Sequence, residues 1–188
     1  KKGKVGEVIT DLGNSVLQAN PSAFWIYLDS AKTATPYDWC SQFARNLRTN
    51  AGVPLASLAK FALTTGKSLR TFKQVEHVDP PEPSAGTATA GELVKNFEAL
   101  TQTGINGPSA PHIVLAIKNF SDYSDEMLTW LSDSLNPAFR KSKFFKGCRF
   151  VFSTQQISSR EKSFFNSFGF EKVNLVEVEP VKVPKAKV

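Results

Sequence analysis

The sequence predicts an α/β fold, a three-layer sandwich in which helices cover both faces of a mostly parallel central sheet. Two observations support this prediction. Short, continuous apolar runs rich in aromatic and β-branched residues occur at 23–30 and 112–120, and such runs are typical of strands buried on both faces. Segments with apolar residues at helical spacing separate them, and strands that alternate with helices usually pair in parallel.

The N-terminal part predicts a helix, a strand and a second helix. A helix over 5–19 is expected because its apolar residues recur at spacings of three and four; they are Val5, Val8, Ile9, Leu12, Val16 and Leu17. The apolar run at 23–30 is the first strand. After it, Thr35 is the expected N-cap and Pro36 suits the first helical position, while Gly52 is expected to stop the helix.

The middle of the chain predicts a short helix, a loop and another helix. Leucine and alanine side chains fall on one side of a helix over 54–66, and Gly66 is its expected C-cap. Residues 78–91, VDPPEPSAGTATAG, combine prolines and small residues without periodicity, so we expect a flexible loop there. Helical periodicity resumes over 91–104.

The C-terminal part continues the alternation of strands and helices. The expected elements are a strand at 112–120, a helix at 125–135, a strand at 148–154, a helix from Ser158 or Ser159 to Gly169, and a fourth strand at 172–181. We expect one domain over 1–180 and a basic tail at 181–188.

Composition and charge limit the functional classes. With 188 residues, of which 41% are hydrophobic, the chain can bury one ordinary core. No apolar run approaches the roughly 18 to 20 residues of a membrane-spanning helix, so no membrane partner is expected. Only two cysteines are present, and no export signal is seen, which favours a reducing intracellular location, cytoplasmic or nuclear.

The tripeptide Gly66-Lys67-Ser68 matches the end of a phosphate-binding Walker A loop, GxxxxGK[ST]. Such a loop follows a strand and opens a helix, so that backbone N–H groups surround the phosphates at the positive end of the helix. Phe61 stands where the first glycine belongs, and the preceding segment is predicted to be helical. We therefore interpret the tripeptide as a coincidence.

A basic segment contributes to the net charge of +6 and contains phenylalanines between its cations, which are Arg140, Lys141, Lys143, Lys146 and Arg149. Lysine and arginine supply most of the affinity for nucleic acids by releasing counterions. Two interpretations stay open, a nucleic-acid-binding surface and a solvated loop before a strand.

Over residues 4–180 the order of elements resembles the ATPase core of the AAA+ and STAND families of P-loop NTPases. In those domains a phosphate-loop helix precedes a strand that ends in an acidic residue, a later strand carries the Walker B acid, and another ends in a small polar sensor residue. Residues 23–47 resemble the first of these strands with its helix, 112–135 the Walker B strand with its helix, and 148–155 the sensor strand.

The resemblance implies a nucleotide site with ATP or ADP as its ligand, and with Mg²⁺ if the site is active. Gly3 and Lys4 match the Gly-Lys pair of Walker A, Asp29 offers a strand-end carboxylate, and Ser153 and Thr154 occupy the sensor position. These residues are the candidate cofactor-binding set.

Two departures from the family pattern predict that hydrolysis is lost. Lys118 stands where the Walker B acid should follow the apolar strand, and a cation there would repel Mg²⁺. Val5 replaces the hydroxyl residue that would contact the metal. The acids that follow, such as Asp125, are expected in the first turn of a helix, where they favour the helix dipole.

We therefore expect a catalytically inactive AAA+/STAND-like domain that acts as a regulatory or assembly module through a protein partner or a homo-oligomer. Two alternatives remain. One is an active ATPase whose Walker A loop is completed by missing N-terminal residues, with Lys4 as phosphate ligand and Asp29 or Asp125 serving Mg²⁺. The resemblance also makes Arg160 a candidate finger residue that acts in trans. The other is a nucleic-acid-binding module that uses the basic segment 140–149.

Overall fold

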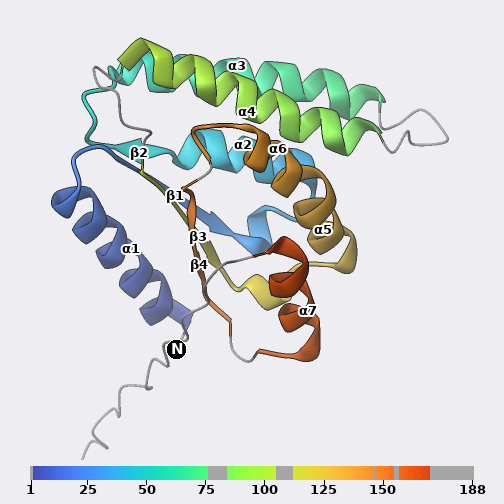
Figure 1. Cartoon of the computed structure of the whole chain (residues 1–188). Coiled ribbons are helices and arrows are strands. Elements are labelled where there is room, and N and C mark those ends of the chain that lie inside the picture. Colours follow the sequence, from blue (N-terminus) through green and yellow to red (C-terminus); the bar gives the residue numbers. More distant parts are fainter. Residues whose placement is uncertain (1, 76–83, 105–111, 146, 155–156, 170–188) are drawn as a thin grey trace, which may run out of the picture.

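The computed structural model of the chain describes residues 2–75, 84–104, 112–145, 147–154 and 157–169 (Figure 1). Its sheet has the strands β1 (Ala23–Asp29), β2 (Arg48–Thr49), β3 (His112–Lys118) and β4 (Arg149–Phe152), in the spatial order β2-β1-β3-β4. β3 pairs in parallel with both β1 and β4, whereas the short β2 pairs with β1 antiparallel. The fold is therefore α/β with a mostly parallel sheet, as predicted.

Seven α-helices and three shorter helical turns accompany these strands in the described part of the chain. The α-helices are α1 (Lys2–Ala19), α2 (Pro36–Asn46), α3 (Leu55–Val75), α4 (Ser84–Gly104), α5 (Asp125–Trp130), α6 (Asn136–Lys141) and α7 (Ser159–Phe168). The turns are the 3₁₀ helices η1 (Ser30–Lys32) and η2 (Phe120–Asp122) and the π-helical turn η3 (Leu131–Leu135).

Side chains of β1 alternate between two apolar clusters, one on each face of the sheet. Phe24, Ile26 and Leu28 belong to the larger cluster, which they share with residues of α2, α4 and the helices after β3. Trp25 belongs to a smaller cluster that contains Ile9 of α1. Figure 1 accordingly shows α1 on one face of the sheet and the other helices on the opposite face. A strand buried on both faces explains the continuous apolar run in the sequence.

The helix predicted after β1 is confirmed at its start and is shorter than expected at its end. The Thr35 side chain accepts a hydrogen bond from the Asp38 amide at 3.1 Å, and Pro36 is in the first turn. The helix ends at Asn46 and not at Gly52, because the chain turns back there to form β2. The Thr49 hydroxyl donates to the Ala23 carbonyl at 2.8 Å and fixes that pairing.

The predicted C-cap at Gly66 is wrong, because α3 continues through Gly66-Lys67-Ser68 to Val75. The tripeptide is thus inside a helix, and the residues directly before it belong to the same helix and not to a strand. Packing against α4 explains the continuation. Thr65 is fully buried and accepts a hydrogen bond from Asn96 of α4 at 3.5 Å, and Phe61 lies 6.0 Å from Phe97, centroid to centroid. Tertiary contacts of this kind override a weak helix former.

The predicted flexible loop at 78–91 is wrong over 84–91, where α4 has already begun. The small residues of this segment allow close packing, since Ala90 and Thr89 are buried. Residues 78–83 lie outside the described residues, as do the predicted strand at 172–181 and the predicted basic tail at 181–188.

The helix predicted over 125–135 continues as far as Lys141. A π-helical turn, η3, joins α5 to α6 just before Pro137. Proline has no N–H to offer the preceding turn, and a locally wider turn accommodates this loss. Among the helices that the structure describes, none combines the length and the apolar character needed to cross a membrane.

Gly13 allows α1 to lie close against the sheet. A Cβ atom built at Gly13 would lie 2.6 Å from two ring atoms of Trp25, whereas one built at Gly6 of the same helix would meet nothing within 4 Å. We expect Gly13→Ala to lower the free energy of unfolding by about 1–3 kcal/mol through overpacking. Gly6→Ala is the matched control and should raise it by up to about 1 kcal/mol, because alanine favours the helix.

Urea unfolding of both variants measures these changes. Equal stability of Gly13→Ala and the wild-type protein would contradict the close approach of α1 to Trp25.

Candidate functional site

The carboxyl ends of the three parallel strands meet at one edge of the sheet. The register pairs Asp29 at the end of β1 with Lys118 at the end of β3. Ser153, which follows β4, donates its amide to the Ile117 carbonyl at 2.9 Å, and its carbonyl accepts from the Phe120 amide at 2.8 Å. Ligand sites of open α/β sheets lie at this edge, so it is the candidate functional site.

Asp29 and Lys118 form an ion pair at this edge. The Lys118 Nζ donates to Asp29 Oδ2 at 3.0 Å, and each side chain keeps less than a fifth of its surface exposed. The hydrogen bond to Asp29 is the main cause that raises the pKa of Lys118. The other Asp29 oxygen accepts from the Ala31 amide at 3.3 Å and caps η1. Both carboxylate oxygens are thus occupied by groups of the chain itself.

A pair of buried hydroxyl groups is connected to Asp29 through the backbone carbonyl of that residue. The hydroxyls of Thr33 and Tyr123 are 2.6 Å apart, and the Thr33 hydroxyl also lies 3.0 Å from the Asp29 carbonyl, to which it donates. Both residues are buried, and burial raises the pKa of Tyr123 to about 12. The phenol is therefore neutral at physiological pH, and it connects η1 to the loop after η2.

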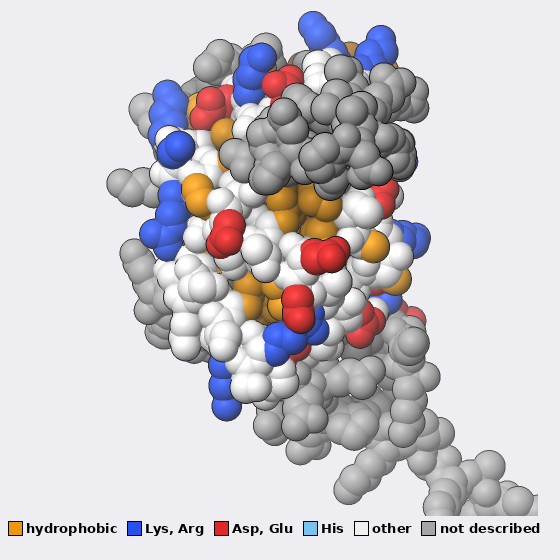
Figure 2. Space-filling view, turned by 90° about the vertical axis from the view of Figure 1, so that its right-hand side faces the viewer, with side chains coloured by type: hydrophobic (Ala, Val, Ile, Leu, Met, Phe, Trp, Pro, Cys, Tyr) orange, Lys and Arg blue, Asp and Glu red, His pale blue; other side chains and the backbone are white. Residues whose placement is uncertain are grey.

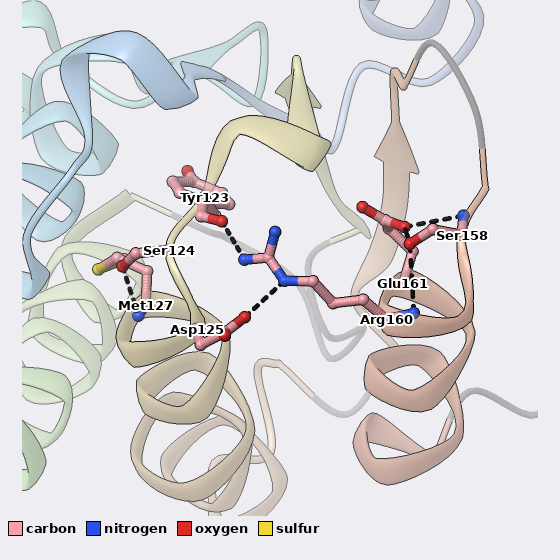
Figure 3. Close-up of polar contacts among 7 residues, drawn as sticks. All are labelled: Tyr123, Ser124, Asp125, Met127, Ser158, Arg160 and Glu161. Atoms are coloured by element: carbon pink, nitrogen blue, oxygen red, sulfur yellow. Dashed lines mark hydrogen bonds and ion pairs between the residues drawn. The ribbon is translucent and has the colours of Figure 1, made fainter.

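Arg160 connects the start of α7 to the start of α5 (Figure 3). Its Nε lies 2.6 Å from Asp125 Oδ1, and its guanidinium also donates to the Tyr123 carbonyl. Asp125 stands in the first turn of α5, as predicted, and Ser124 caps that helix by accepting from the Met127 amide at 3.2 Å. The guanidinium is therefore held by contacts within the chain in this structure.

A capping box starts α7 beside this contact. The Ser158 side chain accepts from the Arg160 amide at 3.2 Å, while Glu161 accepts from the Ser158 amide at 2.9 Å and from the Ser158 hydroxyl. The hydrogen bond from that hydroxyl is the main cause that lowers the pKa of Glu161. The predicted cap at Ser158 is confirmed, and so is the helix end at Gly169, which has a φ of 72°.

Three residues of the predicted cofactor-binding set lie at this edge of the sheet. Asp29 ends β1, and Ser153 and Thr154 follow β4, with β3 between these two strands. Ser153 and Thr154 are half-buried. Gly3 and Lys4 are in the first turn of α1.

Part of the basic segment 140–149 is buried. Arg140 donates to the Phe168 carbonyl at 2.8 Å and to the Gly169 carbonyl at 3.3 Å, so it caps the end of α7. Between the cations, Phe139 and Phe145 are buried and stacked with their centroids 4.0 Å apart.

The other cations of this segment differ in their environment. Lys141, Lys143 and Arg149 are exposed, and the Lys143 Nζ lies 5.0 Å from the centroid of the Phe144 ring. Lys146 lies outside the described residues.

Two contacts of the site were not predicted from the sequence, namely the Asp29–Lys118 pair and the Arg160–Asp125 pair. All four residues had been noted singly. A signal for the first pair existed, because each residue directly follows the apolar run of a predicted strand and parallel strands align their ends. No sequence signal connects Arg160 with Asp125, which are brought together only by the packing of two helices.

Within the described ranges, no group of three or more histidine, cysteine or acidic residues is placed to hold a metal ion. Comparison with the models of known families, with curated proteins and with solved structures finds no match to this chain.

The α7 capping box predicts a specific dependence of stability on pH. Because folding lowers the pKa of Glu161 from its ordinary value of 4.5, its contribution is present above that value and is lost as the pH falls through the lowered pKa. We expect Glu161→Gln to be less stable than the wild-type protein near pH 7 and the difference to shrink as the pH falls below 4.5 and through the lowered pKa. Urea unfolding at several pH values measures this, and a difference independent of pH would contradict the role of the carboxylate.

Proposed function

We propose that this chain is a P-loop-NTPase-like domain of AAA+/STAND type that does not carry out Mg²⁺-dependent ATP hydrolysis and acts as a regulatory or assembly module through protein contacts. The observation that carries the proposal is the Asp29–Lys118 ion pair at the carboxyl edge of the sheet. We place the module inside the cell, in the cytoplasm or the nucleus.

The order and direction of the strands support the family part of the proposal. Parallel β1, β3 and β4 are neighbours, and they end at Asp29, at Lys118 and just before Ser153. These are the positions at which the resemblance implies an acidic residue, the Walker B acid and a sensor residue. Helices lie on both sides of the sheet, which agrees with a three-layer sandwich.

The charge at the strand ends supports the loss of hydrolysis. Catalysis of phosphoryl transfer needs carboxylates that hold Mg²⁺ beside the phosphates. The ammonium of Lys118 lies 3.0 Å from Asp29 Oδ2, so it neutralises the nearest carboxylate and would repel a divalent cation. Asp125, the other carboxylate considered, pairs with Arg160.

Two oppositely charged surfaces support assembly. Leu55 and Leu63 of α3 are 82% and 67% exposed, and the exposed Lys60 and Lys67 accompany them on a helix without acidic residues. Figure 2 shows acidic side chains around exposed hydrophobic areas on the side where α5 and α7 lie. The exposed acids of the η2–α5–η3 region are Asp122, Asp125, Glu126 and Asp133.

We propose a second copy of the chain as the partner. Its acidic surface would contact the basic and apolar face of α3 in the first copy. Such a head-to-tail contact between unlike surfaces can build larger assemblies.

The proposed loss of ATP hydrolysis is tested by measuring ATP hydrolysis and nucleotide binding with and without Mg²⁺. We expect no Mg²⁺-stimulated hydrolysis, and we expect Asp29→Asn to lower stability by about 1 kcal/mol because Lys118 loses its partner. Hydrolysis that requires Mg²⁺ and disappears in both Asp29→Asn and Lys4→Ala would overturn the proposal in favour of an active ATPase.

The assembly part is tested by sedimentation velocity over a range of protein and salt concentrations. We expect self-association that weakens with salt and with the Lys60→Glu/Lys67→Glu variant, because the charge complementarity is lost. Lys95→Glu/Lys141→Glu changes the charge equally on other elements and is the control. A protein that stays monomeric throughout would contradict assembly between copies.

A further inference from the structure

A polar cleft of about 520 Å³ opens on the α1 side of the sheet. Its walls come from α1, from η1 and from the end of α2 with the adjoining β2, and β1 forms its floor. The lining residues that matter here are Thr10, Tyr27, Lys32, Gln42, Arg45 and Arg48. Its volume is within the range of about 300–1,000 Å³ that is usual for small-molecule sites.

The cleft gathers positive charge that is not neutralised by ion pairs. Lys32, Arg45 and Arg48 are exposed, and none of the three has an ion-pair partner among the described residues. The acidic residue of the lining is Asp29, whose carboxylate is already paired with Lys118 at 3.0 Å. The cleft therefore presents a net positive charge to a ligand.

Local structure fixes the two arginines at one wall. Arg45 is in the last turn of α2, and Arg48 follows three residues later in β2. The Arg48 guanidinium donates to Asn14 Oδ1 of α1 at 3.2 Å, a neutral contact that leaves its charge unpaired. Asn46, between them, donates to the Tyr27 carbonyl at 2.7 Å and ties the end of α2 to β1. The Arg48 guanidinium is held in this way at the same wall as Arg45, and guanidinium groups suit the bidentate recognition of phosphate.

The floor supplies a flat apolar surface and neutral polar groups. The Tyr27 ring is half-buried and lies on the same face of β1 as Trp25, which is 2% exposed. Burial raises the pKa of Tyr27, so its hydroxyl is protonated and able to donate. Gln42 adds an amide to the wall. An aromatic ring can stack on tyrosine at such a site, as bases stack on aromatic side chains in nucleic-acid binders.

We propose that this cleft binds a phosphate-bearing aromatic small molecule of mononucleotide size, with its phosphates on Arg45, Arg48 and Lys32 and its ring against Tyr27. The binding needs no Mg²⁺, because the protein itself supplies the cations that face the phosphates. The lining of the cleft shares Asp29 with the candidate site at the sheet edge, but the proposed binding uses neither Gly3 and Lys4 nor the sensor position, and it does not rest on the proposed function.

Calorimetric titration of the chain with ADP, pyrophosphate and adenosine, each without Mg²⁺, tests the proposal. We expect ADP to bind more tightly than either pyrophosphate or adenosine. Arg45→Gln/Arg48→Gln should weaken binding of ADP about tenfold or more, because the charge-assisted contacts to the phosphates are lost. Tyr27→Leu should remove the advantage of ADP over pyrophosphate and leave pyrophosphate binding unchanged.

Two controls separate a built site from general charge attraction. Lys95→Gln/Lys162→Gln removes two exposed cations outside the cleft, and it should change ADP affinity less than about twofold. Thermal unfolding checks that every variant is folded. No binding of ADP, an equal loss in this control, or a loss in Lys4→Ala in place of the arginine variant would overturn the proposal.

Discussion

The burial of β1 on both of its faces is the constraint on which the rest of the structure depends. Its side chains alternate between the cluster under α1 and the larger cluster under the other helices, so β1 fixes the position of both. Each fully buried large side chain contributes about 1.5–3 kcal/mol, and β1 contains five buried residues, four of them consecutive from Ala23 to Ile26. Because β1 cannot shift by one residue without exchanging its two faces, its register with β3 is fixed as well.

That register creates the polar edge of the sheet. Parallel strands that start together also end together, which brings Asp29 beside Lys118 and leaves the loop after β4 next to them. The ion pair is a consequence of register and not of proximity in sequence. The same edge carries the starts of α5 and α7, which Arg160 joins through its contacts with Asp125 and the Tyr123 carbonyl.

The distribution of charge follows from how the helices are used. Acidic residues of the η2–α5–η3 region are exposed because they lie at helix starts or on outward faces, where they suit the helix dipole or solvent. Cations gather in α3 and at the turn from α2 to β2. The acidic residues and the cations give the molecule surfaces of opposite sign. The cations at the turn from α2 to β2 include Arg45 and Arg48, which line the α1-side cleft.

The sequence by itself determined the α/β class with a mostly parallel sheet, the strands β1, β3 and β4, and the cap at Thr35, and it limited the cap of α7 to Ser158 or Ser159. Each of these depends on residues that are close together in the chain, so periodicity and capping chemistry were sufficient to predict them. The sequence also indicated that Gly66-Lys67-Ser68 is no phosphate loop, and α3 runs through this tripeptide.

Tertiary structure alone decided the features that depend on distant residues. α3 passes Gly66 and α4 begins at Ser84 because the two helices bury small residues against each other. The role of Arg140 was decided by the end of α7, almost thirty residues away, which turns a presumed phosphate contact into a helix cap. The basic cleft likewise exists only because α1, α2 and β1 meet in space, and no spacing along the chain encodes that meeting.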